Sequence, residues 1–389
     1  MKKQYILKHI DNDVAEFSIN QLSNRIVYFK IIDNKYCPIN SNENELAQAI
    51  SFNSWLSDRC IPNSREGIER LKNKYNISDI KQVMLYMYGL SLSDHYWIDR
   101  HPFINKWKNI NLYENRYNEL IGSLLFDKKL KLVNNFDNFG NNNPDITTGG
   151  SLKKYWKYNE IENLSYLIKG GSKKDYQEPF NEYYAHLLLN KLEYLHTPYF
   201  LEENNNEYVS SCPCISDINT EMVSGVDLIR KYGIEKSYKG FLDLGIKNGC
   251  VDFRDEVNKM IVIDYLIDNI DRHWHNFGIL RNSRDGKWKG LIPIFDNGYS
   301  LWNKDFVDNN IISESMSFAD SNEECLKLIN ISKYVNKLPN MLDIFDEAFD
   351  RYKNIERKKE LRKGIEEKIK IVENIIEKDI INKNNREDD

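Results

Sequence analysis

The sequence predicts an α+β fold with two lobes, one built on an antiparallel sheet with a single helix and the other mostly helical, behind a mainly helical N-terminal extension. Three observations predict it. Residues 146–220 read as a glycine turn, a strand, a helix and a further strand; residues 221–389 carry apolar side chains mostly at helical spacing; and residues 1–140 contain capped helical patterns. We therefore expect an extension over 1–140, a small lobe over 146–220 and a large lobe with C-terminal helices over 221–389.

Length and composition set the outer limits of this interpretation. A chain of 389 residues suits two or three packed units, and its 41% hydrophobic and 12% aromatic residues are enough to form cores. The net charge of −5 gives no indication of nucleic-acid binding. No apolar run is long enough to cross a bilayer, and the N-terminus lacks a signal-peptide pattern. We expect a cytoplasmic protein with reduced cysteines, no membrane partner and no direct nucleic-acid partner.

The N-terminal extension contains two helical patterns and ends in a linker. Ser64 is a suitable N-cap, because acidic residues follow it in the first turns. A second apolar pattern at helical spacing runs from Ile77 and ends at Gly89. Residues 134–145, NNFDNFGNNNPD, are polar and rich in Asn, which is typical of a loop or linker. The extension shows no catalytic pattern.

The small-lobe elements follow one another in a fixed order. Two glycines at 149–150 form a turn, and residues 166–169 form a strand that ends in Lys169. Residues 178–195 have apolar side chains at helical spacing, and residues 208–215 form another strand. The predicted order is therefore glycine turn, strand with Lys, helix with Glu, and strand.

The clearest chemical signal lies in two short segments of the large lobe. Asp271 and Asn276 are five positions apart in a polar loop that follows the apolar helix 257–267, and Asp296 ends an apolar strand. Phosphoryl transfer needs positioning, a metal that neutralises charge, and a carboxylate that orients or deprotonates the attacking hydroxyl. Asp271 as base, with Asn276 and Asp296 as oxygen ligands of Mg²⁺, would meet these needs. The pattern predicts an ATP- and Mg²⁺-dependent phosphotransferase with a kinase-like centre.

The upstream residues support this prediction by their order. A kinase needs a cation on the α- and β-phosphates, held by an acid on a neighbouring helix. Lys169 is the candidate cation and Glu182 its candidate partner, with Glu178 as the alternative. The competing interpretation is that Lys169 is a solvated strand end and Glu182 a surface helix residue. Asp, Asn and Gly are also ordinary loop residues, so the order of the elements carries the inference.

Two further features have both a functional and a structural interpretation. Gly149, Gly150 and Ser151 could lay backbone N–H groups over phosphates, or could form a plain hairpin turn. His273 follows Asp271 by two positions, and we expect it to shape the catalytic loop, with direct acid–base chemistry as the alternative.

Four segments resemble the HipA-like kinases, bacterial Ser/Thr kinases related to the phosphatidylinositol 3/4-kinase-like branch of the kinase fold. They are Tyr-Leu-Ile-Lys-Gly-Gly at 166–171, Glu-Pro-Phe-Asn-Glu at 178–182, Asp-Arg-His-x-x-Asn at 271–276 and Pro-x-Phe-Asp at 293–296. The resemblance implies that Asp271 is the catalytic base, that Asn276 and Asp296 bind Mg²⁺, and that Lys169 binds ATP phosphates beside Glu182.

The resemblance also implies an adenine-binding hinge, self-modification and a partner. Cys214, Ile215 and Ser216 match the hinge, and Ser151 matches the serine that HipA-like kinases can autophosphorylate in the glycine segment. Some members are toxins, which implies an antitoxin-type protein partner. Those toxins carry a small β-containing subdomain at their N-terminus, from which the helical extension expected over 1–140 departs.

Three functions compete at this stage. The first is a Ser/Thr protein kinase that also autophosphorylates, with an unidentified protein substrate. The second is a phosphoinositide or small-molecule kinase, because the loop that carries Asp271 also resembles that of phosphoinositide kinases. The third is a non-catalytic nucleotide-binding partner module, although no catalytic group is missing from the sequence.

Overall fold

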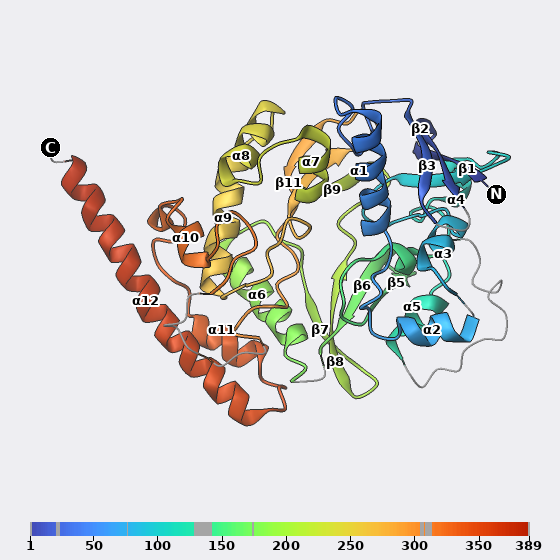
Figure 1. The fold of residues 1–389 in the computed structure, drawn as a ribbon. Helices are drawn as coiled ribbons and strands as arrows, with labels where there is room; N and C mark the ends of the chain where they lie inside the picture. Colours follow the sequence, from blue (N-terminus) through green and yellow to red (C-terminus); the bar gives the residue numbers. More distant parts are fainter. Residues whose placement is uncertain are drawn as a thin grey trace. The chain divides into compact units, whose positions relative to one another are not determined.

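The computed structural model describes residues 2–20, 24–75, 77–127, 142–172, 175–303, 307 and 313–387. The chain divides into two compact units, each made of three segments. Figure 1 labels the helices and strands of both units. Unit 1 comprises Met1–Lys169, Pro213–Ile234 and Leu280–Trp288, and unit 2 comprises Gly170–Cys212, Glu235–Ile279 and Lys289–Asp389. The predicted division at residues 140 and 220 remains a proposal. Residues 134–141 of the predicted linker lie outside the described residues.

Unit 1 contains a four-stranded antiparallel sheet in the order β3-β2-β1-β4. Its strands are β1 (Lys2–His9), β2 (Asn12–Asn20), β3 (Ile26–Ile31) and β4 (Tyr96–Arg100). Side chains alternate between the two faces of a strand, and Tyr5, Leu7 and His9 of β1 are buried accordingly. The expected mainly helical extension over 1–140 therefore needs one correction, because it holds this sheet as well as helices.

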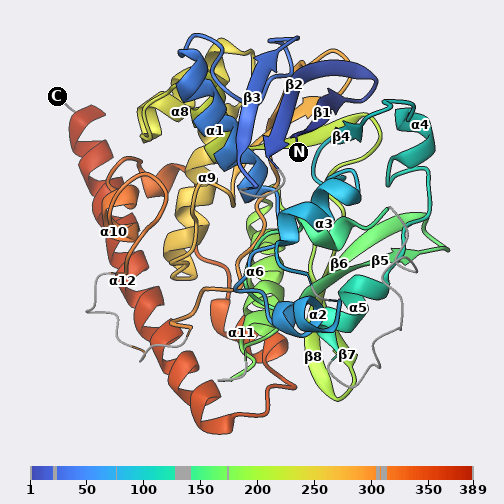
Figure 2. The same ribbon diagram turned by 45° about the vertical axis from the view of Figure 1, so that its right-hand side comes forward.

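Unit 1 also contains helices, several of which pack on this sheet. They are α1 (Glu45–Asp58), α2 (Ile68–Tyr75), α3 (Ile80–Tyr86), α4 (Trp107–Ile110), α5 (Leu120–Phe126) and α7 (Gly225–Tyr232). Helix α1 runs beside β3 (Figure 2), and Phe52 of α1 contacts the rings of Phe17 and Phe29 at centroid distances of 5.0 and 4.5 Å. Stacked and edge-on rings at such distances add to the free energy of burial. This aromatic contact fixes α1 on the sheet.

The two helices predicted between residues 64 and 89 are present as α2 and α3. Both begin later than the sequence suggested, because Ser64 lies in a turn before α2 and Asp79 is the N-cap of α3. The side chain of Asp79 accepts a hydrogen bond from the N–H of Lys81, which satisfies one of the unpaired donors at the helix start.

The predicted small-lobe elements are also present. The short 3₁₀ helix η2 (Pro144–Thr147) leads into the glycine turn, and β5 (Lys154–Asn159) pairs with β6 (Leu164–Gly170) in an antiparallel hairpin. Helix α6 (Glu178–Leu192) follows, and β7 (Phe200–Asn204) forms a second antiparallel hairpin with β8 (Glu207–Pro213). A further sheet has the order β11-β10-β9, from β9 (Thr220–Ser224), β10 (Gly278–Asn282) and β11 (Trp288–Leu291).

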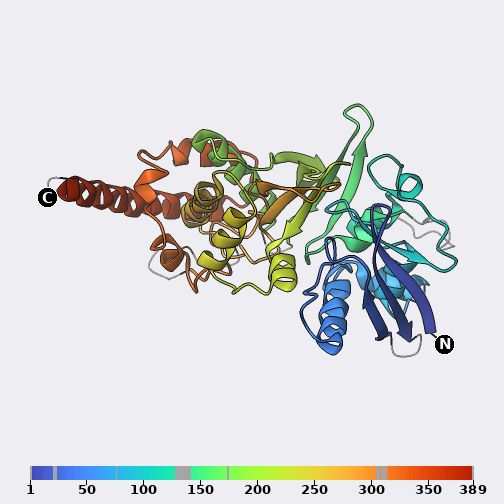
Figure 3. The same cartoon turned by 90° about the horizontal axis from the view of Figure 1, so that it is seen from above.

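Unit 2 is mostly helical. Besides α6 it contains α8 (Tyr238–Lys247), α9 (Phe253–Leu266), α10 (Asn322–Leu326), α11 (Met341–Ala348) and α12 (Ile355–Glu387), the last seen as one long helix in Figure 3. Helix α9 is buried over most of its length, as its apolar pattern predicts. Phe241, Trp274, Phe277 and Phe318 form an aromatic cluster with pairwise centroid distances of 5.0 to 5.9 Å. Trp274 and Phe277 belong to the polar loop that follows α9, so the cluster joins this loop to Phe241 of α8 and to Phe318.

Among the described residues, no helix has both the length and the apolar content that crossing a bilayer requires.

Candidate functional site

Side-chain hydrogen bonds fix the polar loop after α9. Asn269 Nδ2 donates to Asp264 Oδ1 at 2.9 Å, and the N–H of Asp271 donates to Asn269 Oδ1 at 3.0 Å. Asn276 Nδ2 donates to the backbone carbonyl of Asp271 at 2.9 Å. The Asp271 side chain keeps 33% of its surface exposed, while Asn276 is buried. The loop thus holds Asp271 in a defined and accessible position. Because the Nδ2 of Asn276 makes the hydrogen bond to the Asp271 carbonyl, its Oδ1 is not used in that contact.

The guanidinium of Arg272 joins this loop to the segment that carries Asp296. One terminal nitrogen donates to Asp264 Oδ1 at 2.9 Å and to Asn297 Oδ1 at 2.6 Å. The other donates to the backbone carbonyls of Asn276, at 3.3 Å, and of Phe295. Arg272 is 1% exposed. The sequence left open whether Arg272 binds an acid or a phosphate, and the structure shows that it binds an acid.

The surroundings of Arg272 are strongly acidic. Burial alone would lower the pKa of Arg272, but the charge and hydrogen bonds of Asp264, with the nearby charges of Asp296 and Glu182, raise it above its usual value. The guanidinium therefore stays charged. Asp264 and Asn297 are absent from the predicted site, although a carboxylate within an otherwise apolar helix is itself a signal of a buried ion pair.

Asp296 has a backbone conformation that residues other than glycine rarely adopt. Its φ angle is +57°, in the left-handed region, and its N–H donates to the hydroxyl of Tyr199 at 3.1 Å. The next N–H, that of Asn297, donates to Glu182 Oε2 at 2.8 Å. Strained residues of this kind cluster at functional sites. The structure thus brings Glu182 to the segment of Asp296 within unit 2, while Lys169 belongs to unit 1, so the Lys169–Glu182 pair remains a prediction.

His273 has the contacts expected of a residue that shapes the loop. Its N–H donates to the carbonyl of Asp271 at 2.8 Å, and its Nδ1 accepts from the N–H of His275 at 3.3 Å. Its Nε2 lies 3.9 Å from Asp271 Oδ1, which is too far for a hydrogen bond.

In unit 1, Lys154 lies beside both Lys169 and the glycine turn. Lys169 lies directly opposite Lys154 in the β5–β6 hairpin, and both side chains are buried. Directly opposite residues in an antiparallel pair share one face of the sheet. A Cβ built on Gly150 would lie 2.5 Å from Lys154 Nζ. Positive charge therefore gathers beside the glycine turn.

The segment matched to an adenine hinge is held by its side chains. The N–H of Cys214 donates to the Ser165 carbonyl at 2.8 Å, and Ser216 Oγ donates to the Leu92 carbonyl. The hydroxyl of Tyr113 lies 3.1 Å from Ser216 Oγ. Burial raises the pKa of Cys214 to about 11, so its thiol is protonated at neutral pH. Contact of adenine with Cys214, Ile215 and Ser216 remains a prediction.

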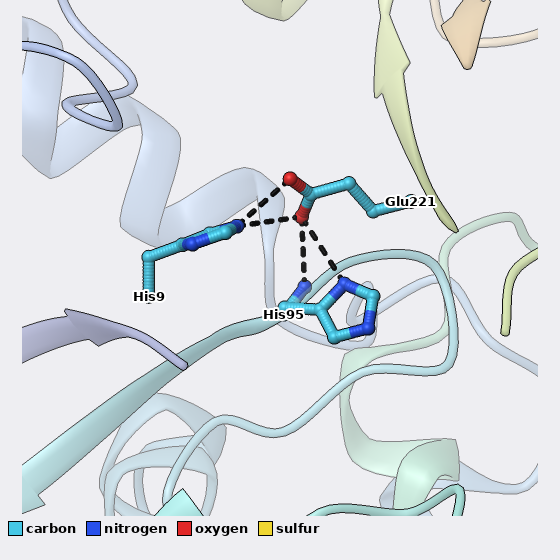
Figure 4. Close-up of side chains that lie close together, drawn as sticks. All are labelled: His9, His95 and Glu221. Atoms are coloured by element: carbon cyan, nitrogen blue, oxygen red, sulfur yellow. Dashed lines mark hydrogen bonds and ion pairs between the residues drawn. The ribbon is translucent and has the colours of Figure 1, made fainter. Parts of the chain in front are cut away.

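A buried cluster elsewhere in unit 1 has metal-ligand residue types. His9 Nε2 lies 2.8 and 3.0 Å from the two carboxylate oxygens of Glu221, and His95 approaches the same carboxylate with its N–H at 3.0 Å and its Nδ1 at 3.4 Å (Figure 4). All three residues are fully buried, and their ligand atoms lie within 4.8 Å of one another.

The contact of Arg281 with Glu221 argues against a metal ion at this cluster. Its Nε donates to Glu221 Oε1 at 2.7 Å, so the carboxylate is already neutralised by a buried cation. A divalent ion would add two charges beside that guanidinium in a fully buried site. Burial would raise the pKa of Glu221, but Arg281 and His9 hold it well below its usual range. We interpret the cluster as an ion and hydrogen-bond network that joins β1, the start of β4 and β9.

Stability should depend on pH through His9. Burial lowers the pKa of His9 below its ordinary value of 6.5 despite the attraction of Glu221, so the unfolded chain binds a proton that the folded chain rejects. His9 should therefore lower the free energy of unfolding as the pH drops below about 6.5, by up to about 1.4 kcal/mol per pH unit, while Asp145, whose pKa burial raises to about 7, contributes a slope of the opposite sign. Denaturant titrations between pH 8 and 5 measure this slope.

His9→Gln is the variant that tests this assignment. It should flatten the slope without abolishing it, because burial also lowers the pKa of His186, to about 4, and that of His196. An unchanged slope in His9→Gln would contradict the role of His9.

Comparison with known proteins supports the fold. No protein-family model matches the sequence, and no curated protein matches it. Among solved structures, HipA of the Shewanella oneidensis MR-1 toxin–antitoxin system, in complex with HipB and operator DNA, is similar with a TM-score of 0.53 at 10% identity, over 97% of this chain and 91% of that one. The Helicobacter pylori proinflammatory kinase CtkA gives a TM-score of 0.47 at 19% identity, over 60% of this chain and 93% of that one. The likeness to HipA confirms the predicted two-lobed, kinase-like α+β fold.

Proposed function

We propose that this chain, which has a HipA-like kinase fold, transfers the γ-phosphate of ATP to a Ser or Thr hydroxyl of a protein with the help of Mg²⁺. The observation that carries the proposal is the Arg272 guanidinium, which ties the loop of Asp271 and Asn276 to the segment of Asp296. Phosphoryl transfer is catalysed mainly by such positioning and by charge stabilisation.

Each acidic or amide side chain then has one task. Asp271 accepts the proton of the attacking hydroxyl as the bond from its oxygen to the γ-phosphorus forms and the bond to the bridging oxygen of ADP breaks. Asn276 Oδ1 and the Asp296 carboxylate are the oxygen donors that suit Mg²⁺, which neutralises phosphate charge when bound. Lys169, with Glu182 as its partner, binds the α- and β-phosphates.

Autophosphorylation is a further part of the proposal, with Ser151 as its site. Ser151 is exposed, whereas the hydroxyls of its neighbours are engaged. Thr147 Oγ1 donates to the Leu90 carbonyl at 2.6 Å and Thr148 Oγ1 to the Pro144 carbonyl at 2.8 Å. After incubation with ATP and Mg²⁺, we expect phosphopeptide mapping to find phosphate on Ser151. Ser151→Ala should lose it and Thr148→Ala should keep it; phosphate on Thr147 or Thr148 in the parent would contradict the assignment.

A partner protein also enters the proposal through the comparison. The HipA structure is a complex with HipB and operator DNA, so an antitoxin-type partner fits a chain with this fold. The expectation that this chain has no direct nucleic-acid partner finds no support in that comparison.

Labelled ATP offered with different acceptors tests the choice of substrate class. Protein mixtures, phosphoinositide vesicles and small polyols would each be incubated with the parent and with Asp296→Ala. The proposal predicts label on protein with the parent alone. Label on lipid or polyol would instead establish a phosphoinositide or small-molecule kinase. Mg²⁺-dependent ATP binding without transfer to any acceptor would indicate a non-catalytic nucleotide-binding module.

A further inference from the structure

A buried arginine from the N-terminal region holds the glycine turn. Arg65 is 2% exposed, and its guanidinium donates to three consecutive carbonyls: those of Thr148 and Gly149, both at 2.7 Å, and that of Gly150, at 2.8 Å. A fourth donor reaches the Lys154 carbonyl at 3.4 Å. The turn therefore wraps around one cation through its backbone.

This wrapping sets the direction of the N–H groups. In a trans peptide the C=O and the N–H point in opposite directions. Carbonyls 148, 149 and 150 all face Arg65, so the N–H groups of Gly149, Gly150 and Ser151 face away from it. Consecutive N–H groups that point to one side form a concave site for an anion, of the kind that binds phosphates.

The turn is exposed, and the amino group of a lysine lies beside it. The N–H groups of Gly149, Gly150 and Ser151 donate to no backbone carbonyl in the described part of the chain. Both glycines are exposed, and a Cβ on Gly149 would meet no atom within 4 Å, so a ligand can approach the backbone closely. Gly150 has a φ angle of +86°, which favours glycine, and Lys154 Nζ lies beside it.

We propose that Arg65 is a positioning residue that holds the glycine turn as a phosphate-binding site, so that the N-terminal region takes part in nucleotide binding. Arg65 acts on the carbonyl side, and the nucleotide phosphates bind on the N–H side. Arginine suits this task because its fork of five donors can satisfy several carbonyls at once, whereas lysine offers a single nitrogen. The identification of the ligand as nucleotide rests on the proposed function, but the phosphate site itself does not.

The test separates phosphate binding from adenine binding and from folding. Inorganic tripolyphosphate and adenosine would each be titrated by calorimetry into the parent, Arg65→Gln, Arg65→Lys and Arg59→Gln. Arg59 is the matched control, since it is another buried arginine of unit 1, and its donors go to Asp94 and to the carbonyls of Gly89 and Tyr96. Amide NMR of the parent would record the N–H signals of the glycine turn during the tripolyphosphate titration.

We expect tripolyphosphate to shift the amide signals of Gly149, Gly150 and Ser151 in the parent. Arg65→Gln should weaken tripolyphosphate binding by roughly 10- to 100-fold, because several charge-assisted hydrogen bonds lose their alignment. Arg65→Lys should lie between Arg65→Gln and the parent. Adenosine affinity should be unchanged in both variants, and Arg59→Gln should bind tripolyphosphate as the parent does.

Three outcomes would overturn the inference. They are parent amides of the turn that do not respond to tripolyphosphate, Arg65 variants that bind it as tightly as the parent, and an equal loss of tripolyphosphate affinity in Arg59→Gln. If Arg65→Gln does not fold, the tripolyphosphate affinity of Arg65→Lys and the amide shifts of the parent still test the inference. Tripolyphosphate binding in a parent that transfers no phosphate from ATP would reject the proposed kinase function and leave the role of Arg65 standing.

Discussion

Asp271→Ala should reduce phosphate transfer from ATP by about 10²- to 10⁴-fold, the range in which a positioned general base contributes. The loop around Asp271 is fixed by backbone and Asn side-chain contacts that do not involve its carboxylate. The variant should therefore fold, bind Mg²⁺–ATP with little change and lose turnover. Steady-state kinetics with a labelled acceptor protein measure the effect.

A surface aspartate of the same unit provides the control. Asp243 in α8 is exposed, and Asp243→Ala should leave turnover within about twofold of the parent. Retained turnover in Asp271→Ala would contradict the assignment of the base. A loss of similar size in His273→Ala would instead support the acid–base alternative for that residue.

Asp264→Ala should lower the free energy of unfolding by about 3–5 kcal/mol, which is the usual cost of leaving one partner of a buried ion pair alone. Its carboxylate accepts from two nitrogens of Arg272 and from Asn269, and both charged side chains are almost fully buried. The variant removes the ion-pair partner of this buried guanidinium, which itself belongs to the loop of Asp271. Denaturant unfolding monitored by tryptophan fluorescence measures the change.

Asp346→Ala is the matched control for this stability effect. Asp346 also pairs with an arginine from a helix of unit 2, but the side chains of Asp346 and Arg362 are 44% and 39% exposed. Exposed pairs contribute about 0–1 kcal/mol, so the loss should not exceed that. Equal losses in Asp264→Ala and Asp346→Ala would show that the Asp264–Arg272 pair does not anchor the site.

Much of the fold around the site is local in the sequence and could be predicted from it. The strand ending in Lys169, the helix beginning at Glu178 and the apolar helix before Asp271 all appear, because each has a clear period and clear flanking signals. The N-terminal sheet was missed because the turn between β1 and β2, which pair locally, has no glycine to mark it, and because β4 joins β1 from about 90 residues away. The sequence around β1 contains no local pattern that identifies the distant β4 as its partner strand.

The candidate site could be predicted only in part, for the same reason. Short motifs contain Asp271, Asn276 and Asp296, and the residue types of these motifs indicate which reaction they could catalyse. The contacts that hold them join distant residues: Arg272 reaches Asn297, and Glu182 accepts from the same segment. Arg65 gave no signal at all, because its partners are backbone carbonyls, which every residue possesses.

The most direct test of the central claim is intact-mass spectrometry of the purified protein before and after incubation with ATP and Mg²⁺, beside Asp296→Ala. The account predicts a gain of one or more phosphates in the parent, mapped to Ser151, and no gain in the variant, which lacks a proposed Mg²⁺ ligand. The same gain in Asp296→Ala would contradict the proposed site. No gain in the parent, together with no transfer to any offered acceptor, would contradict the kinase function itself.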